Sequence, residues 1–293
     1  MKILLIGRTG QLGSDLLRNR YKTDEFYAPA RDTLDIECPE SIEKTIQYYH
    51  PEIVINTAAF HKVPLCEVEY DMAFKINCVA VRNLAKACKD TGAVFVTFST
   101  DYVFDGKKGT PYLEDDKPAP LQLYGISKLA GEFAAMSVWP EKTIIIRSCG
   151  LYGISGAQSK GGNFVDKRVY DAKASKPPEI SCDQTVCPTS TDDLSKVVLQ
   201  LIGKENIEPG IYHLVNEGEC TWYEFTKAIF EIMEFNLEVK PVDRKGRSGE
   251  MRRPLYSVLA NTKAKALGIV LPHWRDALKR YLRVRYMSGG SSI

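Results

Sequence analysis

The chain has 293 residues and 44% of them are hydrophobic, which is enough to bury a full core in one large or two small domains. A net charge of +2 at pH 7 gives no reason to expect nucleic acid or a membrane surface as a partner, and no apolar run is long enough to span a bilayer. The eight cysteines lack the spacing of metal ligands, so we expect reduced thiols, no bound metal and a cytoplasmic location.

The chain begins with the pattern of a dinucleotide-binding loop. Lys2–Ile6 reads as a short buried strand, and a helical pattern covers residues 11–20. The glycine-rich turn between them allows a tight turn, a close backbone approach to a pyrophosphate and close packing of the helix on the strand. The helix N-terminus then faces the phosphates with its unpaired amides. We expect this turn to bind the cofactor through Gly7, Thr9, Gly10, Gln11, Leu12 and Gly13.

The second predicted strand, residues 25–30, bears on which nicotinamide cofactor is bound. NAD-selective sites carry an acidic residue at the end of this strand, where it binds the ribose hydroxyls. Here no carboxylate stands at that end, and Arg31 together with Arg8 can pair with a 2′-phosphate. We therefore favour NADPH, with NADH tolerated, and expect Asp35 and Ile36 to contact the adenine.

Strand and helix patterns alternate through the first half of the chain. The predicted strands cover residues 2–6, 25–30, 53–58, 93–99 and 143–147, and the predicted helices cover residues 11–20, 41–49, 67–89 and 125–138. This alternation predicts a Rossmann-type α/β fold, in which a doubly wound parallel sheet has helices on both faces. Ligands bind at the carboxyl ends of such strands, so the glycine turn should share one cleft with Ala58, Ala59, Thr100 and Ser148.

The second half of the chain is less regular and predicts a smaller domain. Its predicted strands cover residues 177–182, 211–215 and 238–242, and its predicted helices cover residues 192–202, 222–233 and 274–282. We expect an NAD(P)-binding domain made of residues 1–149 and about 183–210. A discontinuous α/β substrate domain then takes about 150–182 and 211–284, and residues 285–293 form a tail.

Residues 98–128 contain the groups that reduction of a carbonyl by a nicotinamide hydride requires. Thr100 ends an apolar run, and Tyr124 and Lys128 are four residues apart, which places them on one face of a helix. As the hydride arrives, the carbonyl oxygen becomes an alkoxide that needs a proton donor and a hydrogen-bond donor. An ammonium about 4 Å from the phenol, at an effective dielectric near 20, contributes roughly 4 kcal/mol, or about 3 pKa units. We therefore expect Lys128 to lower the pKa of Tyr124.

The same spacing occurs a second time, at Tyr223 and Lys227. With fifteen tyrosines in the chain, about one such match is expected by chance. The second pair lies in an amphipathic helical pattern and follows no strand that ends in hydroxyl residues. We expect it to be a solvated helix face without a catalytic role.

Several segments together resemble an extended short-chain dehydrogenase/reductase. These segments are the glycine turn, residues 56–59, residues 99–106 and residues 124–128. Later segments are similar to the dTDP-4-dehydrorhamnose reductase family, namely residues 162–165, Asp183-Gln184, Pro188-Thr189, Asp193-Leu194 and residues 253–257. The similarity spans about residues 1–281.

The resemblance implies the last step of dTDP-L-rhamnose synthesis, which supplies cell-surface polysaccharides. In that reaction NAD(P)H reduces the 4-keto group of dTDP-4-dehydro-L-rhamnose. Carried onto this sequence, Tyr124 is the general acid, Lys128 lowers its pKa and holds the nicotinamide ribose, and Thr100 hydrogen-bonds the carbonyl. The implied contacts to the sugar nucleotide are Thr100, Asp101, Tyr102, Asn163 and Arg253. A guanidinium such as that of Arg253 pairs bidentately with a pyrophosphate.

The chain departs from that family in three places. A tryptophan that commonly follows the fifth strand and stacks near the substrate is replaced by Gly150-Leu151. Residues 60–66 differ from the usual run, and the loop at residues 154–161 is longer than in the shortest members. His61 lies in the second of these segments, where we expect a structural hydrogen bond rather than catalysis. These departures leave the exact sugar and nucleotide open.

Other functions are also open. Related 4,6-dehydratases place Asp-Glu after the threonine, whereas Asp101 is followed here by Tyr102, which argues against dehydration. A nucleotide-sugar epimerase, which consumes no net NADPH, shares the fold and the Tyr-Lys pair. A non-catalytic NADP-binding regulatory subunit, similar to that of methionine adenosyltransferase, is the third reading. The sequence is compatible with a monomer or a homodimer.

Overall fold

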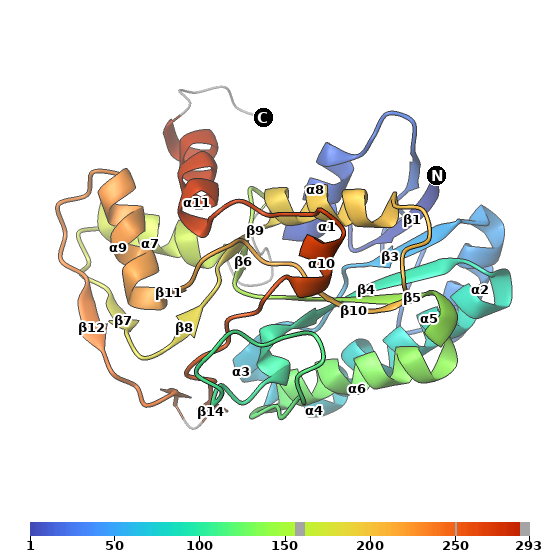
Figure 1. Cartoon of the computed structure of the whole chain (residues 1–293), viewed down its shortest axis with the longest axis horizontal. Helices are drawn as coiled ribbons and strands as arrows, with labels where there is room; N and C mark the ends of the chain where they lie inside the picture. The colour runs from blue at the N-terminus through green and yellow to red at the C-terminus, as the bar shows by residue number, and fades with distance from the viewer. Residues whose placement is uncertain (156–161, 250, 288–293) are drawn as a thin grey trace.

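The computed structural model describes residues 1–155, 162–249 and 251–287. Its centre is a six-stranded sheet in the order β10-β5-β4-β3-β1-β2, in which every neighbouring pair is parallel. The strands are β1 (Lys2–Ile6), β2 (Glu25–Tyr27), β3 (Ile53–Asn56), β4 (Val94–Thr100), β5 (Thr143–Ser148) and β10 (Gly210–His213). Figure 1 shows helices on both faces of this sheet, so the predicted Rossmann-type α/β fold is confirmed.

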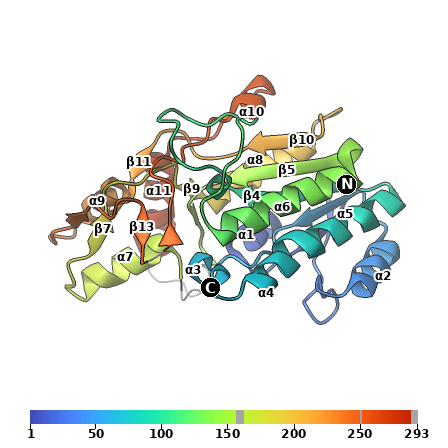
Figure 2. The same ribbon diagram turned by 90° about the horizontal axis from the view of Figure 1, so that it is seen from below.

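The helices cover both faces because the central strands are apolar on both sides. Along β1, Ile3 and Leu5 belong to one core cluster, whereas Leu4 and Ile6 belong to a second cluster on the opposite face. The covering helices are α1 (Gln11–Asn19) and α8 (Thr191–Ile202) on the first face and α2 (Pro39–Tyr49), α5 (Ala80–Thr91) and α6 (Leu123–Val138) on the second. Figure 2 shows α5 and α6 side by side. Within the described ranges, no helix has the length and apolar character needed to cross a membrane.

The segment expected to form one helix over residues 67–89 is broken in the structure. After α3 (Val63–Cys66) come α4 (Tyr70–Phe74), a π-helical turn over Lys75–Val79 and then α5. The buried side chain of Asn77, on the π-helical turn, donates to the Phe60 carbonyl at 2.9 Å and to the Ser127 hydroxyl at 3.0 Å. These bonds join the turn to the loop after β3 and to α6. The prediction of one continuous helix is therefore wrong, because tertiary hydrogen bonds outweigh the local pattern.

A smaller unit lies beside the sheet and has a core of its own, built by residues such as Val165, Phe225 and Trp274. Its strand pairs are β6 (Leu151–Tyr152) with β9 (Thr189–Ser190), β7 (Glu179–Ser181) with β12 (Lys240–Val242), β8 (Thr185–Val186) with β11 (Cys220–Thr221) and β13 (Arg247–Ser248) with β14 (Met251–Arg252). Its helices are α7 (Phe164–Lys173), α9 (Trp222–Ile232) and α11 (Trp274–Leu282). Single turns occur at Asp101–Val103, Pro140–Lys142 and Arg283–Met287.

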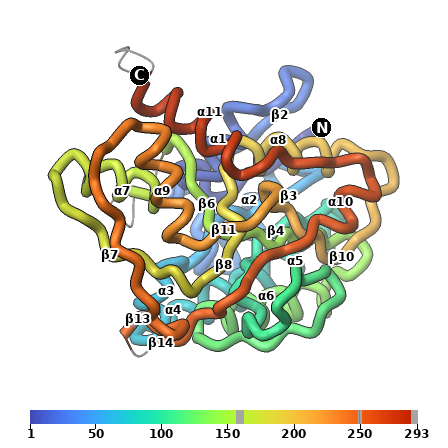
Figure 3. Tube along the Cα trace, turned by 60° about the vertical axis from the view of Figure 1, so that its left-hand side comes forward, coloured from blue at the N-terminus to red at the C-terminus, as the bar shows by residue number. Residues whose placement is uncertain are grey.

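The strand β10 belongs to the large sheet, where it pairs with β5. The expected domain boundary assigns residues from 211 onward to the smaller unit, and the structure differs here because Tyr212 and Leu214 pack in the core of the large sheet. Figure 3 shows the chain after β14 returning along the large unit to α10 (Thr262–Ala266), beside β10, before it reaches α11. Of the expected tail, residues 285–287 are helical and residues 288–293 lie outside the described residues, as do residues 156–161 of the expected long loop.

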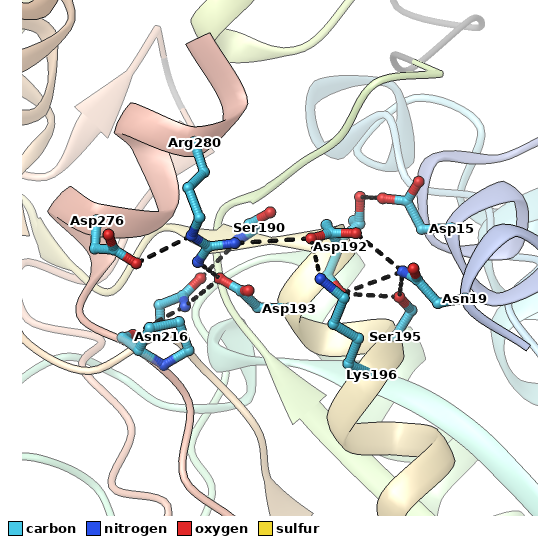
Figure 4. A network of polar contacts seen from close by, with 12 residues as sticks. Asp15, Asn19, Ser190, Asp192, Asp193, Ser195, Lys196, Asn216, Asp276 and Arg280 are labelled. Atoms are coloured by element: carbon cyan, nitrogen blue, oxygen red, sulfur yellow. Dashed lines mark hydrogen bonds and ion pairs between the residues drawn. The ribbon is translucent and has the colours of Figure 1, made fainter. Parts of the chain in front are cut away.

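A network of charged side chains joins α11 to α8 and α1 (Figure 4). Arg280 of α11 donates to Asp193 of α8 at 2.8 Å and to Asp276 at 3.0 Å. Arg18 of α1 donates to Asp192 of α8 at 2.8 Å. Burial raises the pKa of Asp192, but hydrogen bonds from its cationic and amide neighbours outweigh burial and hold that pKa at about 2. The network fixes the last helix of the smaller unit against two helices of the sheet.

Replacing Arg280 with methionine should lower the free energy of unfolding by about 1–3 kcal/mol, because the buried Asp193 carboxylate loses a charged donor. Arg275→Met is the matched control on the same helix, since the partner of Arg275, Glu231, is 69% exposed. We expect a loss of less than about 1 kcal/mol for the control. Urea unfolding at neutral pH measures both variants, and equal losses would contradict the role given to the network.

Candidate active site

The glycine turn after β1 forms the tight cradle that the sequence predicts. Gly7 has a φ of +89°, and a Cβ there would lie 2.5 Å from the Thr57 hydroxyl. A Cβ on Gly13 would lie 2.2 Å from the Gly7 carbonyl oxygen, so only glycine lets α1 start this close to the turn. No side chain caps α1 at Gly10. The cradle and the uncapped helix N-terminus fit the pyrophosphate of a dinucleotide.

The other expected members of the turn have distinct positions. Gln11 joins the turn to the segment around β6, because the Gly153 amide donates to its side-chain oxygen at 3.0 Å. Leu12 is buried in the core beneath α1, so only its backbone can face a ligand. Thr9 is exposed. The amide of Ala58 donates to the Asn56 side chain at 3.1 Å, which places Ala58 and the following Ala59 at the end of β3, beside Gly7.

The cations expected to select NADPH both lie near the end of β2. The Arg8 guanidinium donates to the Ala28 carbonyl at 3.1 Å. Arg31 is 79% exposed and pairs with Glu37, which also pairs with Lys75 at 2.9 Å. Glu37 was not among the predicted site residues, although a carboxylate six residues after Arg31 is a visible signal. Asp35 and Ile36 lie in the turn before α2, where Asp35 accepts from the Glu37 amide.

The three expected catalytic residues converge at the carboxyl end of β4. Thr100 is the last residue of β4, and Tyr124 and Lys128 lie in the first two turns of α6. A Cβ on Gly125 would lie 2.2 Å from the Tyr102 carbonyl oxygen, so α6 starts directly against the turn that follows Thr100. The Thr100 side chain lies near enough to the Tyr124 phenol to lower its pKa, and the Tyr124 ring meets that of Tyr102 edge-on at 6.3 Å.

Burial raises the pKa of Tyr124 above its ordinary value, and the negative charge of Asp101 raises it further. The expectation of a lowered pKa is therefore wrong for the protein on its own, because desolvation of the phenolate outweighs the ammonium one turn away. Burial also lowers the pKa of Lys128 to about 8, with Glu132 opposing that shift. Within the part of the chain that the structure describes, the Lys128 ammonium makes no hydrogen bond. The Lys128 ammonium is therefore available to a ligand.

The residues expected to touch the sugar nucleotide divide into two groups. Arg253 donates to the Tyr102 phenol at 2.9 Å, and its Nε is buried without a partner among the described residues, so these two side chains offer polar groups near Tyr124. Asp101 and Asn163 are turned toward the protein. The Asn163 amide donates to the Gly153 carbonyl at 3.0 Å and to the Tyr281 hydroxyl at 2.9 Å, and its oxygen caps α7.

A tryptophan does lie at the end of β5, but α9 supplies it. A Cβ on Gly150 would lie 3.1 Å from the Trp222 ring, and Gly150 has a φ of +56°. The Trp222 ring also packs on Phe164, with 4.5 Å between ring centroids. The family pattern has its tryptophan directly after the strand, where this chain has Gly150-Leu151. No local pattern could have found one so far along the chain.

The second Tyr-Lys pair lies on α9 of the smaller unit. Tyr223 and Lys227 contact each other on α9, where the Lys227 ammonium lies 5.5 Å from the centre of the Tyr223 ring. His61 lies 3.2 Å from the Ala59 carbonyl oxygen, a local contact of the loop after β3. Among the described residues, no group of three or more His, Cys, Asp or Glu side chains is placed to hold a metal ion.

Comparison with known proteins identifies the family. The family model for the RmlD substrate binding domain matches residues 1–287. The chain belongs to this family. The spore coat polysaccharide biosynthesis protein SpsK of Bacillus subtilis is 37% identical to it over 97% of this chain and 98% of that protein.

Two solved structures are similar over nearly the whole chain. The dTDP-4-dehydrorhamnose reductase of Clostridium acetobutylicum is 36% identical, with a TM-score of 0.90, and the match covers 97% of this chain and 99% of that one. The enzyme of the same name from Bacillus anthracis, solved in complex with NADP, is 33% identical with a TM-score of 0.90, covering 96% and 98%. The predicted family is confirmed and, at the level of the family, so is the prediction of an NAD(P)H-dependent oxidoreductase.

Replacing Lys128 with methionine should raise the stability of the cofactor-free protein at pH 7 by on the order of 1–3 kcal/mol, because the buried ammonium is desolvated. The pKa of Lys128 is about 8 in the folded protein and lies near 10.4 in an unfolded chain. The penalty is therefore complete below pH 8 and disappears as the pH rises toward about 10.4.

Thermal unfolding between pH 7 and pH 10 measures this effect, and the gain of the variant should shrink across that range. Lys227→Met on α9 is the control, because Lys227 is exposed and should show no such trend. A Lys128 variant that is less stable than the parent at every pH would contradict the assignment of a desolvated ammonium.

Proposed function

We propose that this protein reduces the 4-keto group of a nucleotide-linked deoxysugar with NADPH, and that it converts dTDP-4-dehydro-L-rhamnose to dTDP-L-rhamnose. The observation that carries the proposal is the convergence of Thr100, Tyr124 and Lys128 at the strand ends that also carry the glycine turn. The relatives named dTDP-4-dehydrorhamnose reductase support the substrate. The name of SpsK states no substrate, and its similarity to this chain supports a role in polysaccharide biosynthesis.

The residues of the glycine cradle fit NADPH, and when bound it supplies the hydride. Gly7, Gly10 and Gly13 leave room for the pyrophosphate, and Arg8 and Arg31 stand where they can pair with a 2′-phosphate. The complex of the Bacillus anthracis enzyme with NADP supports this preference, and NADH is the weaker alternative. The Lys128 ammonium, free of protein partners in the described residues, is available for the nicotinamide ribose.

Tyr124 acts as the general acid that protonates the alkoxide at C4. Its raised pKa suits this role, because the phenol keeps its proton until an oxygen of higher basicity forms beside it. Arg253 and Tyr102 line the substrate side, where the buried Nε of Arg253 can bond the diphosphate. Trp222 offers a flat apolar surface for the sugar or the base.

The protein is proposed to act in the cytoplasm as a monomer or a homodimer, with the nucleotide sugar as its partner. The smaller unit is proposed to hold most of the sugar nucleotide. An epimerase remains the second candidate, because it would use the same Tyr-Lys pair.

The purified protein, mixed with NADPH and enzymatically generated dTDP-4-dehydro-L-rhamnose, should lose NADPH absorbance and form dTDP-rhamnose. An epimerase would convert the sugar without net loss of NADPH. Binding of NADPH with neither reaction would contradict the proposal and favour the regulatory role.

Tyr124→Phe should leave NADPH binding nearly unchanged and lower turnover by about 10²–10⁴, as loss of a general acid does. Steady-state kinetics and a binding titration measure the two properties separately. Tyr223→Phe removes the phenol of the decoy pair and should turn over at the parental rate. Near-normal turnover in Tyr124→Phe would remove that phenol from the mechanism.

A further inference from the structure

A carboxylate lies between two cations where the segment after β2 meets the turn before α5. Glu37 accepts from the Arg31 guanidinium through one oxygen and from the Lys75 ammonium, at 2.9 Å, through the other. Arg31 follows β2, whereas Lys75 begins the π-helical turn that leads into α5. The three side chains therefore form a bridge between the segments that follow β2 and β3.

This bridge lies at the edge of the sheet where the adenosine half of the cofactor is expected. The strands β2 and β3 are the two neighbours of β1, which carries the glycine turn. Ligands of such sheets bind across the carboxyl ends of the strands. Glu37 directly follows Asp35 and Ile36, and its amide donates to the Asp35 side chain at 3.0 Å. The carboxylate of Glu37 thus belongs to the rim of the site proposed for the adenosine.

Of the three groups in the bridge, Arg31 is the one free to change its partner. The Glu37 side chain is 16% exposed and is held by Lys75, whereas the Arg31 side chain is 79% exposed. An exposed ion pair contributes little free energy, so Glu37 holds Arg31 only weakly. A phosphate monoester carries a charge of about −1.5 to −2 at pH 7 and pairs bidentately with a guanidinium. A 2′-phosphate is therefore the stronger partner for Arg31.

Once Arg31 has turned to a phosphate, the charge of Glu37 has to be balanced by Lys75. A carboxylate without a cation beside it would repel the phosphate and attract Arg31 back. The Lys75 ammonium lies 2.9 Å from the second carboxylate oxygen and balances that charge in place. We propose that Glu37 competes with the 2′-phosphate of NADPH for Arg31, and that Lys75 weakens this competition.

Glu37 and Lys75 are then positioning residues, which act through Arg31 and set the preference for NADPH over NADH. The proposal rests on the proposed use of a nicotinamide cofactor. NADH carries a hydroxyl in place of the 2′-phosphate, so it gives Arg31 no stronger partner than Glu37. The bridge should therefore affect the affinities for the two cofactors differently, which a merely structural ion pair would not do.

Glu37→Gln removes the competing charge and keeps the shape of the side chain. Its dissociation constant for NADPH should fall by about threefold to fivefold, the upper range for an exposed ion pair, and that for NADH should change by less than about twofold. Isothermal titration calorimetry measures both constants without any sugar. Unchanged or weaker NADPH binding would overturn the proposal. Weaker NADH binding would also overturn it, because Glu37 would then be a ligand of the ribose hydroxyls.

Lys75→Met leaves Glu37 with Arg31 alone, so NADPH should bind about threefold to fivefold more weakly and NADH about as before. The double variant tests how Lys75 acts. If Lys75 acts through Glu37, the variant with both Glu37→Gln and Lys75→Met should bind NADPH as tightly as Glu37→Gln does. A loss of affinity that persists in the double variant would overturn the proposal, because Lys75 would then attract the phosphate directly.

A second ion pair between α2 and α5 supplies matched controls. Lys86 of α5 pairs with Glu43 of α2 at 3.3 Å, and both side chains are about half exposed. Glu43→Gln and Lys86→Met make the same changes of charge further along the two helices. Neither should alter the ratio of the two dissociation constants by more than about twofold. Changes as large as those at Glu37 and Lys75 would overturn the proposal, because they would follow from net charge alone.

These outcomes are separate from that of the proposed reduction. If the keto sugar is not reduced but the affinity for NADPH responds to the variants as described, the proposed substrate is wrong and this proposal stands. If the sugar is reduced but the affinity for NADPH does not depend on Glu37 and Lys75, the reduction stands and this proposal is wrong. Binding of neither cofactor would overturn both.

Discussion

The site depends on one buried ion pair between α6 and β5. Arg147, 2% exposed, donates to both oxygens of Glu132, 3% exposed, at 2.9 and 2.6 Å. Removing two charges from water costs free energy, and their mutual attraction returns it only in part. Such a buried pair therefore fixes geometry more than it adds stability. Glu132 lies four and eight residues after Lys128 and Tyr124, on the same face of the helix. The bidentate bond between Arg147 and Glu132 therefore turns the side chains of Lys128 and Tyr124 toward the sheet.

Two glycines let α6 lie close enough for that bond to form. A Cβ on Gly125 would be 2.2 Å from the Tyr102 carbonyl oxygen, and one on Gly131 would be 2.0 Å from that of Asn77. The first contact places Tyr124 beside the turn after β4, and the second seats the helix on the π-helical turn. The backbone contacts set the distance of α6 from its neighbours, and the ion pair sets its rotation. Together they bring Tyr124 to Thr100.

Local patterns in the sequence predicted the parts of the site that local geometry builds. The glycine turn, the first five strands and the Tyr124–Lys128 face are of this kind. Asp101 and Asn163 were expected to meet the substrate and instead bond protein groups, and their partners Ser257 and Tyr281 lie 156 and 118 residues away. The place of β10 in the large sheet could not be predicted for the same reason, because β10 joins that sheet by pairing with β5, far earlier in the sequence. A contact between residues far apart in the sequence produces no local spacing from which it could be predicted.

The direction of a pKa shift cannot be predicted from a local sequence pattern either. One ammonium about 4 Å from a phenol is worth about 3 pKa units, and complete burial of a titratable group can shift its pKa by about 3–5 units in the opposite direction. Two effects of this size cannot be ranked from a Tyr-x-x-x-Lys spacing, because burial depends on what the fold places around the pair. Here burial raises the pKa of Tyr124 and lowers that of Lys128 to about 8, so near pH 7 the phenol stays neutral while the amine stays an ammonium. A site tuned in this way holds its proton for donation, and the same pair in a more open cleft would suit a base.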